Sequence, residues 1–409
     1  MSVLAVPAIQ LQALAAPGAP PDPGETWWEW TKELVGGLDI DNLPSVIFFP
    51  LLTLAVFVWC WFRRKKGKRW YFFPLPLAII PFLIGALAAV NLHFGLYNTL
   101  GDLWATYPFP TGAASLLSDP NGSHPDGVSV QIDIPSPGSK VGSQPAFIWL
   151  PPQYFTEPKG TKFPVIYLYH GTPGDYTQWF LGGNAQQVGL TAAKAGSPAI
   201  LVSPQVIATE FEDTECVNGA QGNWQDYIAI DIPAFIAKNA SALSGATAQS
   251  AAGLSMGGYC AQIVALRNPA LMGIFGNFSG STMPTYSSMQ DLFGPVPDLQ
   301  ATVNTYTSDW VIANQPASHT VKSWLMIGAQ DDPGLISDEQ SYTAQAKGLN
   351  MNATFNAIPG THSFYVWSAA LAEWLPWALS QMSKPGATTV APPANASSPP
   401  ASPTPAPGQ

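Results

Sequence analysis

The segment Gly253–Gly257 restricts the fold of this chain more than any other, because it reads G-x-S-x-G. That pattern is typical of a serine held on a sharp turn between a β-strand and an α-helix. The small residues 248–252 before it can form a buried strand, and residues 259–267 after it have a helix composition that an Asn-Pro pair ends. The flanking glycines permit the strained turn, and the helix N-terminus directs backbone N–H groups toward negative charge near Ser255. We therefore expect Ser255 to be a nucleophile.

From about residue 128 the chain alternates between strand-like and helix-like segments. Residues 128–134 alternate apolar and polar side chains, which predicts a half-exposed strand, whereas 163–169 is continuously apolar and predicts a buried central strand. Further strands are expected at 146–150, 199–203, 273–278, 323–327 and 353–358, and helices at 226–239 and 339–349. This alternation predicts an α/β fold with a mostly parallel sheet covered on both faces.

Two uncharged stretches, 44–62 and 70–92, enclose a basic segment, 63–69, that holds six of the sixteen Lys and Arg residues. A bilayer is crossed by roughly 20 apolar residues in a helix, and both stretches are about that long. Because basic loops stay on the cytoplasmic side, we predict a two-helix transmembrane hairpin over 44–92 with a cytoplasmic loop. The alternative is a buried helical hairpin of a soluble protein, which six basic residues between the stretches disfavour. The hairpin places both chain ends outside the cytoplasmic membrane.

The predicted domains are an exported N-terminal segment (1–43), the hairpin (44–92), a catalytic domain (100–383) and a tail (384–409). The N-terminal segment is a poor signal peptide because its first sixteen residues contain no basic residue. Its tryptophans favour either an interfacial helix or an aromatic-rich segment without a specific role. The tail is rich in Pro, Ala, Ser and Thr, and we expect it to be disordered.

Charge and cysteine usage exclude several classes of function. The net charge is −10, and from residue 101 onward nine basic residues stand against twenty acidic ones. This acidity argues against nucleic acid as a partner. Three cysteines are too few for a zinc cluster or a disulfide-rich scaffold, and we expect no metal or other cofactor. Cys60 lies in the first apolar stretch, so Cys216 and Cys260 are either a disulfide pair outside the membrane or two free thiols.

A serine nucleophile needs a base, usually a histidine oriented by a carboxylate. His362 follows the last predicted strand, where a loop can reach back to Ser255, and we take it as the base. The acid should follow the preceding strand, and there Asp331 is the first choice and Asp332 the reserve. One of these two acids is expected to cap the following turn. Further along, 338–339 is interpreted as the acidic first turn of the next helix.

The oxyanion of a tetrahedral intermediate needs backbone donors. One should be the N–H of Met256, directly after the nucleophile. The other should come from the loop after the strand 163–169, where Gly171 allows the backbone to turn and the Thr172 N–H can face the serine. His170 and Trp179, near that loop, are candidate substrate contacts, the alternative for His170 being a histidine packed under the turn. Aromatic residues in the insertion 281–317 could line an acyl site or pack in the core; they include Tyr286, Phe293, Tyr306 and Trp310.

Three segments, 167–171, 253–258 and 360–367, together resemble the esterase D-type family, which includes S-formylglutathione hydrolases, feruloyl esterases and mycobacterial mycolyltransferases. The resemblance spans about 128–382. It implies an α/β-hydrolase fold, a Ser-acid-His triad and acyl-enzyme chemistry. Mycolyltransferases use a Glu as the acid, and they carry an Asp and an Arg for trehalose where this chain has His170 and Pro173.

These observations predict a membrane-anchored, extracytoplasmic serine esterase or acyltransferase that acts on an ester or acyl-lipid substrate. Mycolyltransferase-like acyl transfer to a cell-envelope sugar is one alternative. A non-catalytic binding protein on a hydrolase scaffold is the other.

Overall fold

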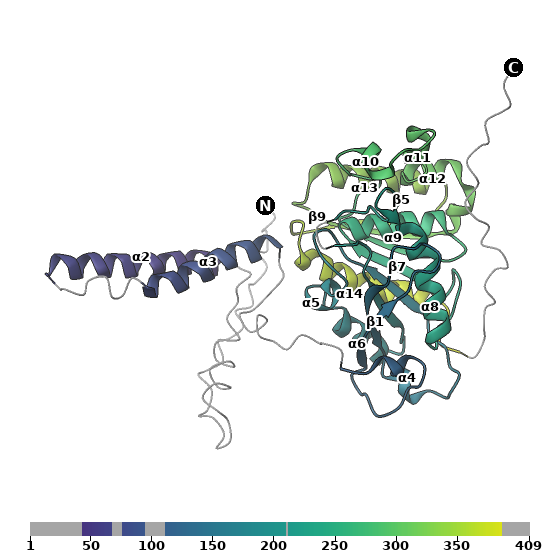
Figure 1. The fold of residues 1–409 in the computed structure, drawn as a ribbon, viewed down its shortest axis with the longest axis horizontal. Coiled ribbons are helices and arrows are strands. Elements are labelled where there is room, and N and C mark those ends of the chain that lie inside the picture. The colour runs from purple at the N-terminus through teal and green to yellow at the C-terminus, as the bar shows by residue number, and fades with distance from the viewer. Residues whose placement is uncertain (1–42, 68–75, 95–110, 210–211, 387–409) are drawn as a thin grey trace, which may run out of the picture. The chain divides into compact units, whose positions relative to one another are not determined.

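The computed structural model describes residues 43–67, 76–94, 111–209 and 212–386 (Figure 1). Contacts divide the chain into two compact units, the first holding an apolar helical pair and the second the α/β part from about residue 106 onward. The tryptophan-rich part of the N-terminal segment, for which an interfacial helix was one of two alternatives, lies outside the described residues, as does nearly all of the tail expected to be disordered.

The helical pair consists of α2 (Leu43–Lys65) and α3 (Pro76–Phe94). Within the described residues, one helix is long and apolar enough to cross a membrane, Val46–Lys65, with a mean hydropathy of 2.0. The apolar part of α3, Leu77–Asn91, is shorter, because the expected second stretch begins in residues that are not described. The helices touch at Gly85, where a Cβ would lie 3.1 Å from Phe49 Cβ. Their outward faces keep large apolar side chains at least half exposed, among them Leu51, Phe57, Trp61, Leu83 and Leu87.

The second unit is built on an eight-stranded sheet of order β1-β2-β4-β3-β7-β8-β9-β10. The strands are β1 (Val128–Ile134), β2 (Gln144–Leu150), β3 (Val165–Tyr169), β4 (Ile200–Pro204), β7 (Gln249–Leu254), β8 (Ile274–Phe278), β9 (Lys322–Gly328) and β10 (Ala353–Ile358). The strands from β4 to β10 in this order are parallel, and β1 and β2 are antiparallel to their neighbours. Tyr169 of β3 pairs with Gly253 of β7, so the loop after β3 begins beside the G-x-S-x-G segment.

Helices cover both faces of this sheet. The named helical segments are η2 (Ala114–Leu117), α4 (Gln153–Thr156), α5 (Gln178–Leu181), α6 (Ala185–Lys194), α7 (Trp224–Asp226), η3 (Tyr227–Asp231), α8 (Ile232–Asn239), α9 (Met256–Arg267), α10 (Met289–Phe293), α11 (Leu299–Asn304), α12 (Ser308–Asn314), η4 (Pro316–Thr320), α13 (Pro333–Gly348) and α14 (Phe364–Gln381). A short hairpin, β5 (Asn218–Gly219) and β6 (Gly222–Asn223), precedes α7.

Alternate side chains of the central strands enter two separate cores. Tyr167 packs with α8, α9, α12 and α13 on one face, whereas Ile166 and Leu168 pack with α5, α6 and α14 on the other. The prediction of a mostly parallel sheet covered on both faces is therefore confirmed.

The predicted start of the helix after β9 is wrong. The helix begins at Pro333 rather than Glu339, because the Asp332 carboxylate accepts from the Gly334 and Leu335 N–H groups as an N-cap, and proline suits the first helical position. Asp338 and Glu339 therefore lie inside the helix, and Glu339 is fully buried.

Candidate active site

Ser255 lies on the turn between β7 and α9, with φ 53° and ψ −126°. A non-glycine residue in this region of backbone space is strained, and such strain concentrates at functional sites. The Ser255 N–H donates to the Phe278 carbonyl at the end of the neighbouring strand, 2.9 Å away. The serine is thus fixed at the carboxyl edge of the sheet, as its sequence pattern predicts.

The glycines around the serine are required by close backbone approach. A Cβ at Gly253 would lie 1.9 Å from the Gly257 carbonyl oxygen. A Cβ at Gly257 would lie 2.2 Å from the Tyr169 carbonyl oxygen. Both distances are far inside van der Waals contact, so a side chain at Gly253 would distort the turn itself and one at Gly257 would force it away from the end of β3.

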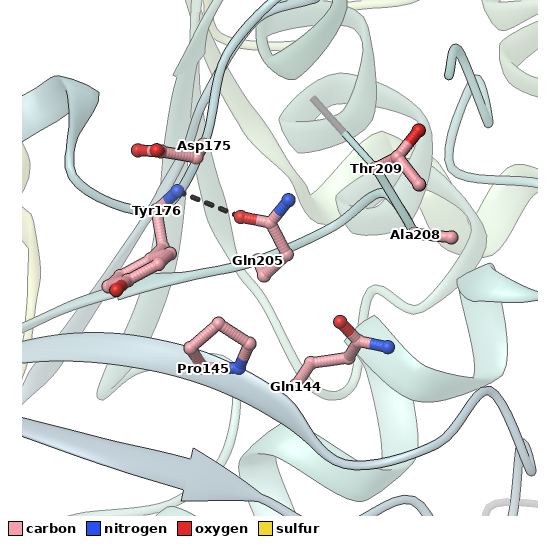
Figure 2. A pocket seen from close by; sticks show the side chains of 7 residues that line it. All are labelled: Gln144, Pro145, Asp175, Tyr176, Gln205, Ala208 and Thr209. Carbon is pink, nitrogen blue, oxygen red and sulfur yellow. Dashed lines mark hydrogen bonds between the residues drawn. The ribbon is translucent and has the colours of Figure 1, made fainter. Parts of the chain in front are cut away.

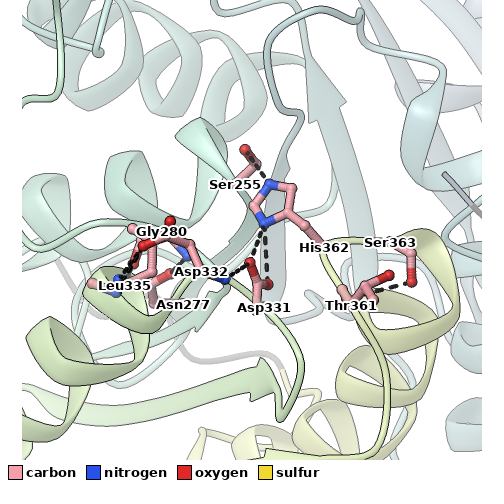
Figure 3. A network of polar contacts seen from close by, with 10 residues as sticks. Ser255, Asn277, Gly280, Asp331, Asp332, Leu335, Thr361, His362 and Ser363 are labelled. Carbon is pink, nitrogen blue, oxygen red and sulfur yellow. Dashed lines mark hydrogen bonds and ion pairs between the residues drawn. The ribbon is translucent and has the colours of Figure 1, made fainter. Parts of the chain in front are cut away.

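His362 connects the serine to a carboxylate, as Figure 3 shows. Its Nε2 lies 2.9 Å from the Ser255 Oγ, and its Nδ1 lies 3.1 Å from each carboxylate oxygen of Asp331. Because a carboxylate can only accept, we assign the ring proton to Nδ1, which leaves Nε2 to accept the serine proton. The three residues come from the ends of β7, β9 and β10, and the fold brings them into one series of contacts.

The two adjacent acids after β9 have different partners. Asp331 faces His362, whereas the Asp332 carboxylate caps α13, 2.7 Å from the Gly334 nitrogen. The Asp332 N–H also donates to Asp331 Oδ1 at 2.8 Å, which helps to orient that carboxylate. The geometry therefore favours Asp331, the first choice from the sequence, over Asp332.

Burial alone would raise the pKa of Asp331, whose side chain is only 2% exposed. The hydrogen bond from His362 and its charge act in the opposite direction and leave the pKa below its ordinary value. The carboxylate is thus held in its charged form, which stabilises a protonated imidazole.

The two proposed oxyanion donors flank the serine. Met256 is the first residue of α9, and a Cβ placed on Gly171 would lie 3.2 Å from the Ser255 Cβ. The loop after β3 is itself braced, because the Gly171 N–H donates to Gln178 Oε1 and Gln178 Nε2 donates to the Pro173 carbonyl. The loop that carries the Thr172 N–H therefore lies against the nucleophile.

The two candidate substrate contacts are both inside the protein. His170 and Trp179 have no exposed surface, and the Trp179 indole N–H donates to the Tyr169 carbonyl at 2.8 Å. Neither side chain presents surface to a substrate in this structure. Both instead support the loop after β3 from below, which corresponds to the alternative considered for His170.

Cys216 and Cys260 form a disulfide, with their Cα atoms 5.5 Å apart. Cys260 lies on α9, and its Sγ is 3.1 Å from the Met256 Sδ. The bridge therefore joins the segment after β4 to the first turns of the helix that carries one of the proposed oxyanion donors.

Two buried carboxyl groups near the site were not predicted from the sequence. Glu215, beside Cys216, accepts from the N–H and hydroxyl of Thr285 at 2.7 and 2.8 Å, and so links the segment after β4 to the insertion after β8. Burial, with Asp213 nearby, raises the pKa of Glu215 to about 7. Burial, with Asp331 nearby, raises the pKa of Glu339 well above its ordinary value. The neighbours of each residue in the sequence are polar, so an exposed position would be expected. Only the position of Glu215 beside a cysteine that forms the disulfide could have suggested burial.

The aromatic residues of the insertion after β8 mainly pack in the core. Phe293 and Tyr306 are each 4% exposed and contact one another, with ring centroids 5.2 Å apart. Tyr286 and Trp310 are partly buried against the same core. The core-packing alternative therefore describes these four residues better than an acyl-site lining.

A cavity of about 460 Å³ opens beside the loop after β3 (Figure 2). It is lined by Gln144, Pro145, Asp175, Tyr176, Gln205, Ala208 and Thr209. The Tyr176 N–H donates to Gln205 Oε1 across its wall at 3.0 Å. Ser255, His362 and Asp331 are not among the residues that line it.

The sheet order and a strained serine between strand and helix define the second unit as an α/β hydrolase. Residues 141–378 match the model of the putative esterase family, and the chain belongs to that family. The resemblance to esterases is therefore confirmed, and the protein is an ester hydrolase or acyltransferase.

The chain is also similar to other proteins in sequence and in structure. An uncharacterized protein of Corynebacterium glutamicum is 27% identical over 381 residues, which cover 87% of this chain and 82% of that protein. A fluorophosphonate-binding serine hydrolase of Staphylococcus aureus superposes with a TM-score of 0.53 at 18% identity, over 62% of this chain and 98% of that one. A ferulic acid esterase gives a TM-score of 0.52 at 19% identity with the same coverage. At these identities the two structures show the shared fold alone.

Proposed function

We propose that the protein is a membrane-anchored serine esterase or acyltransferase that faces the outside of the cell and works through Ser255, His362 and Asp331. The observation that carries the proposal is the unbroken series of contacts from hydroxyl to imidazole to carboxylate, 2.9 and 3.1 Å long. A non-catalytic binding protein would not need this series or a nucleophile on a strained turn.

In the first half of the reaction, the Ser255 Oγ attacks the ester carbonyl while His362 Nε2 takes its proton. Asp331 holds the Nδ1–H and stabilises the imidazolium. The N–H groups of Met256 and Thr172 donate to the oxyanion of the tetrahedral intermediate. His362 then returns the proton to the departing alcohol oxygen, which leaves the acyl group on Ser255.

In the second half, an acceptor hydroxyl attacks the acyl-enzyme and His362 takes its proton. Water as acceptor gives hydrolysis, and a sugar hydroxyl gives acyl transfer. The two outcomes differ in how well water is excluded and an acceptor is bound, so acyl-enzyme partition between water and added sugars, followed by mass spectrometry, distinguishes them.

A fluorophosphonate probe tests the nucleophile directly. The wild type should be labelled once, at Ser255, and the Ser255→Ala variant should not be labelled. Ser363→Ala is the matched control, because that serine lies beside His362 and its hydroxyl has only a 3.4 Å contact with the Thr361 carbonyl. Equal labelling of wild type and Ser255→Ala would refute the proposal.

We further propose that α2 and α3 form a transmembrane hairpin within residues 44–92, with the basic loop 63–69 in the cytoplasm and the catalytic domain, 100–383, outside. The outward apolar side chains of the pair and the basic residues at the end of α2 support this topology. Residues 1–43 and the tail 384–409 are then also extracytoplasmic. An ester or acyl-lipid substrate would meet the enzyme at the membrane surface.

Single cysteines test the topology in a Cys60→Ser background, where Cys216 and Cys260 are paired. A membrane-impermeant maleimide applied to intact cells should label Lys347→Cys, an exposed position on α13. It should label Lys66→Cys, an exposed position directly after α2, only after the membrane is permeabilised. The reverse pattern would invert the hairpin, and labelling of both positions in intact cells would exclude it.

A further inference from the structure

The proposed reaction leaves one histidine at the carboxyl edge of the sheet without a role. His170 is fully buried directly after β3, and backbone groups contact both of its ring nitrogens. Nδ1 lies 2.9 Å from the Gly171 carbonyl oxygen, and Nε2 lies 3.1 Å from the Val206 nitrogen. A backbone N–H can only donate, so Nε2 accepts from Val206, and the ring proton lies on Nδ1 and donates to Gly171. The surroundings thus fix both the tautomer and the ring orientation.

The Gly171 carbonyl belongs to the same peptide unit as the Thr172 N–H. That unit is planar and trans, so its C=O and N–H point in opposite directions. An anchor on the carbonyl therefore sets the direction of the N–H. Gly171 has no side chain to restrain this rotation, and it lies so close to the nucleophile that a Cβ on it would be 3.2 Å from the Ser255 Cβ. A hydrogen bond to the carbonyl also polarises the peptide and makes its N–H a better donor.

The ring is held by the segment that the disulfide ties to α9. Thr214 Oγ1 donates to the Val206 carbonyl at 2.9 Å and accepts from the Cys216 N–H at 3.2 Å. Cys216 is bonded to Cys260 on α9, the helix that begins immediately after Ser255. The anchor of His170 and the nucleophile turn are therefore fastened to the same helix.

We propose that His170 is a positioning residue whose Nδ1–H holds the Gly171–Thr172 peptide so that the Thr172 N–H faces the oxyanion. This inference rests on the proposed function. Burial lowers the pKa of His170 to about 4, against the opposing hydrogen bond to Gly171 and the charge of Asp175. The ring is thus neutral, with a single proton to donate, over the pH range in which a serine esterase works.

Two substitutions separate the two hydrogen bonds of the ring. In His170→Asn the amide nitrogen lies near the position of Nδ1 and can still donate to Gly171. In His170→Gln the amide group reaches the position of Nε2 and can still accept from Val206, but the donor to Gly171 is lost. Both variants replace a buried ring by a smaller polar side chain, so each serves as the control for the other.

The test uses the full chain in detergent with a p-nitrophenyl ester. Removal of an oxyanion donor lowers kcat by about 10²- to 10³-fold, so loss of its anchor in His170→Gln should lower kcat by about 10- to 100-fold at unchanged KM. His170→Asn should stay within about 3-fold of the wild type, because it retains the donor. Equal kcat in the two variants, or a greater loss in His170→Asn, would overturn the proposal.

Two further measurements, of the His170 tautomer and of fluorophosphonate labelling, complete the test. If either variant fails to fold, ¹⁵N NMR of histidine-labelled wild type decides, because a proton on Nε2 of His170 contradicts the proposal. Fluorophosphonate labelling separates the two hypotheses. A wild type that is not labelled contradicts the proposed function, whereas a labelled wild type with the wrong ranking of the variants contradicts the role of His170 alone.

Discussion

The loop after β3 begins with His170 and the loop after β10 contains His362, and the two rings have opposite surroundings. The His362 side chain is 36% exposed and contacts a carboxylate and a hydroxyl. His170 is fully buried and contacts two backbone groups. In both rings Nδ1 is the donor, so the difference lies in what receives its proton.

That difference in surroundings is what suits His362, and not His170, to the proton transfer proposed above. The Asp331 carboxylate stabilises a positive charge on His362, and the ring is open to substrate. The Gly171 carbonyl carries no charge, and burial opposes any charge on His170. The same side chain at the same edge of the sheet thus suits proton transfer in one loop and orientation of a peptide in the other.

The largest expected effect separates the two loops directly. His362→Gln should lower kcat by roughly 10⁴- to 10⁶-fold, because His362 is the base that lies within hydrogen-bond distance of the Ser255 Oγ in the described part of the chain. Its melting temperature should be close to that of the wild type, since the ring is partly exposed. Substitution of His170 should reverse the balance, with a far smaller loss of kcat and a clear loss of stability. Steady-state kinetics and thermal unfolding of both variants measure kcat and stability. A greater loss of kcat in His170→Gln than in His362→Gln would contradict the different roles assigned to the two rings.

The second prediction concerns the two acids behind His362. Asp331→Asn should lower kcat by about 10⁴-fold, because an amide can donate to Nδ1 and stabilise the wrong tautomer. Asp332→Ala should lower the free energy of unfolding by about 1 kcal/mol through loss of the α13 cap. Its kcat should change little. Should Asp332→Ala be the inactive variant, the carboxylate contacts of His362 described above would not be those of the working enzyme.

A smaller effect on kcat is expected from removal of the Cys216–Cys260 disulfide, which helps to hold the segment that contacts His170. The disulfide closes a separation of 44 residues. Loop-closure entropy over that length makes its loss cost about 4 kcal/mol. Unfolding of a Cys216→Ser, Cys260→Ser double variant, compared with Cys60→Ser as the control, measures this. The double variant should also lose part of its kcat, because the anchor of His170 loosens while His362 keeps its contacts. Unchanged stability would show that the segment after β4 is held without the bridge.

The sequence predicts the groups on the His362 side better than those on the His170 side, for a physical reason. A nucleophile, a base and an acid must follow particular strands, and few residues of the right type stand at those positions, so Ser255 and His362 could be chosen by location. Asp331 and Asp332 follow the same strand, and only the direction of each side chain separates them.

Burial of polar residues was harder to predict. Glu215 and Glu339 lie in polar runs, and their burial depends on how distant segments pack over them. The role of His170 depends on the Val206 N–H, which lies on another strand's loop and leaves no pattern in the sequence. The sequence pattern predicts the start of α13 at Glu339, although Pro333 suits a first helical turn capped by Asp332.

The last expected effect is a contribution of the buried His170 ring to the pH dependence of stability. The pKa of His170 falls from 6.5 to about 4 in the folded protein, so between these values the unfolded chain binds the extra proton and the native chain does not. Its contribution is therefore fully present above pH 6.5 and is lost as the pH falls toward 4, by about 3 kcal/mol in total. The difference in unfolding free energy between wild type and His170→Asn, measured by denaturant at several pH values, isolates this contribution from the carboxyl groups that titrate in the same range. A difference that stayed constant from pH 7 to pH 4 would mean that His170 is as free to take a proton as a solvent-exposed histidine, and the contrast between the two loops would fail.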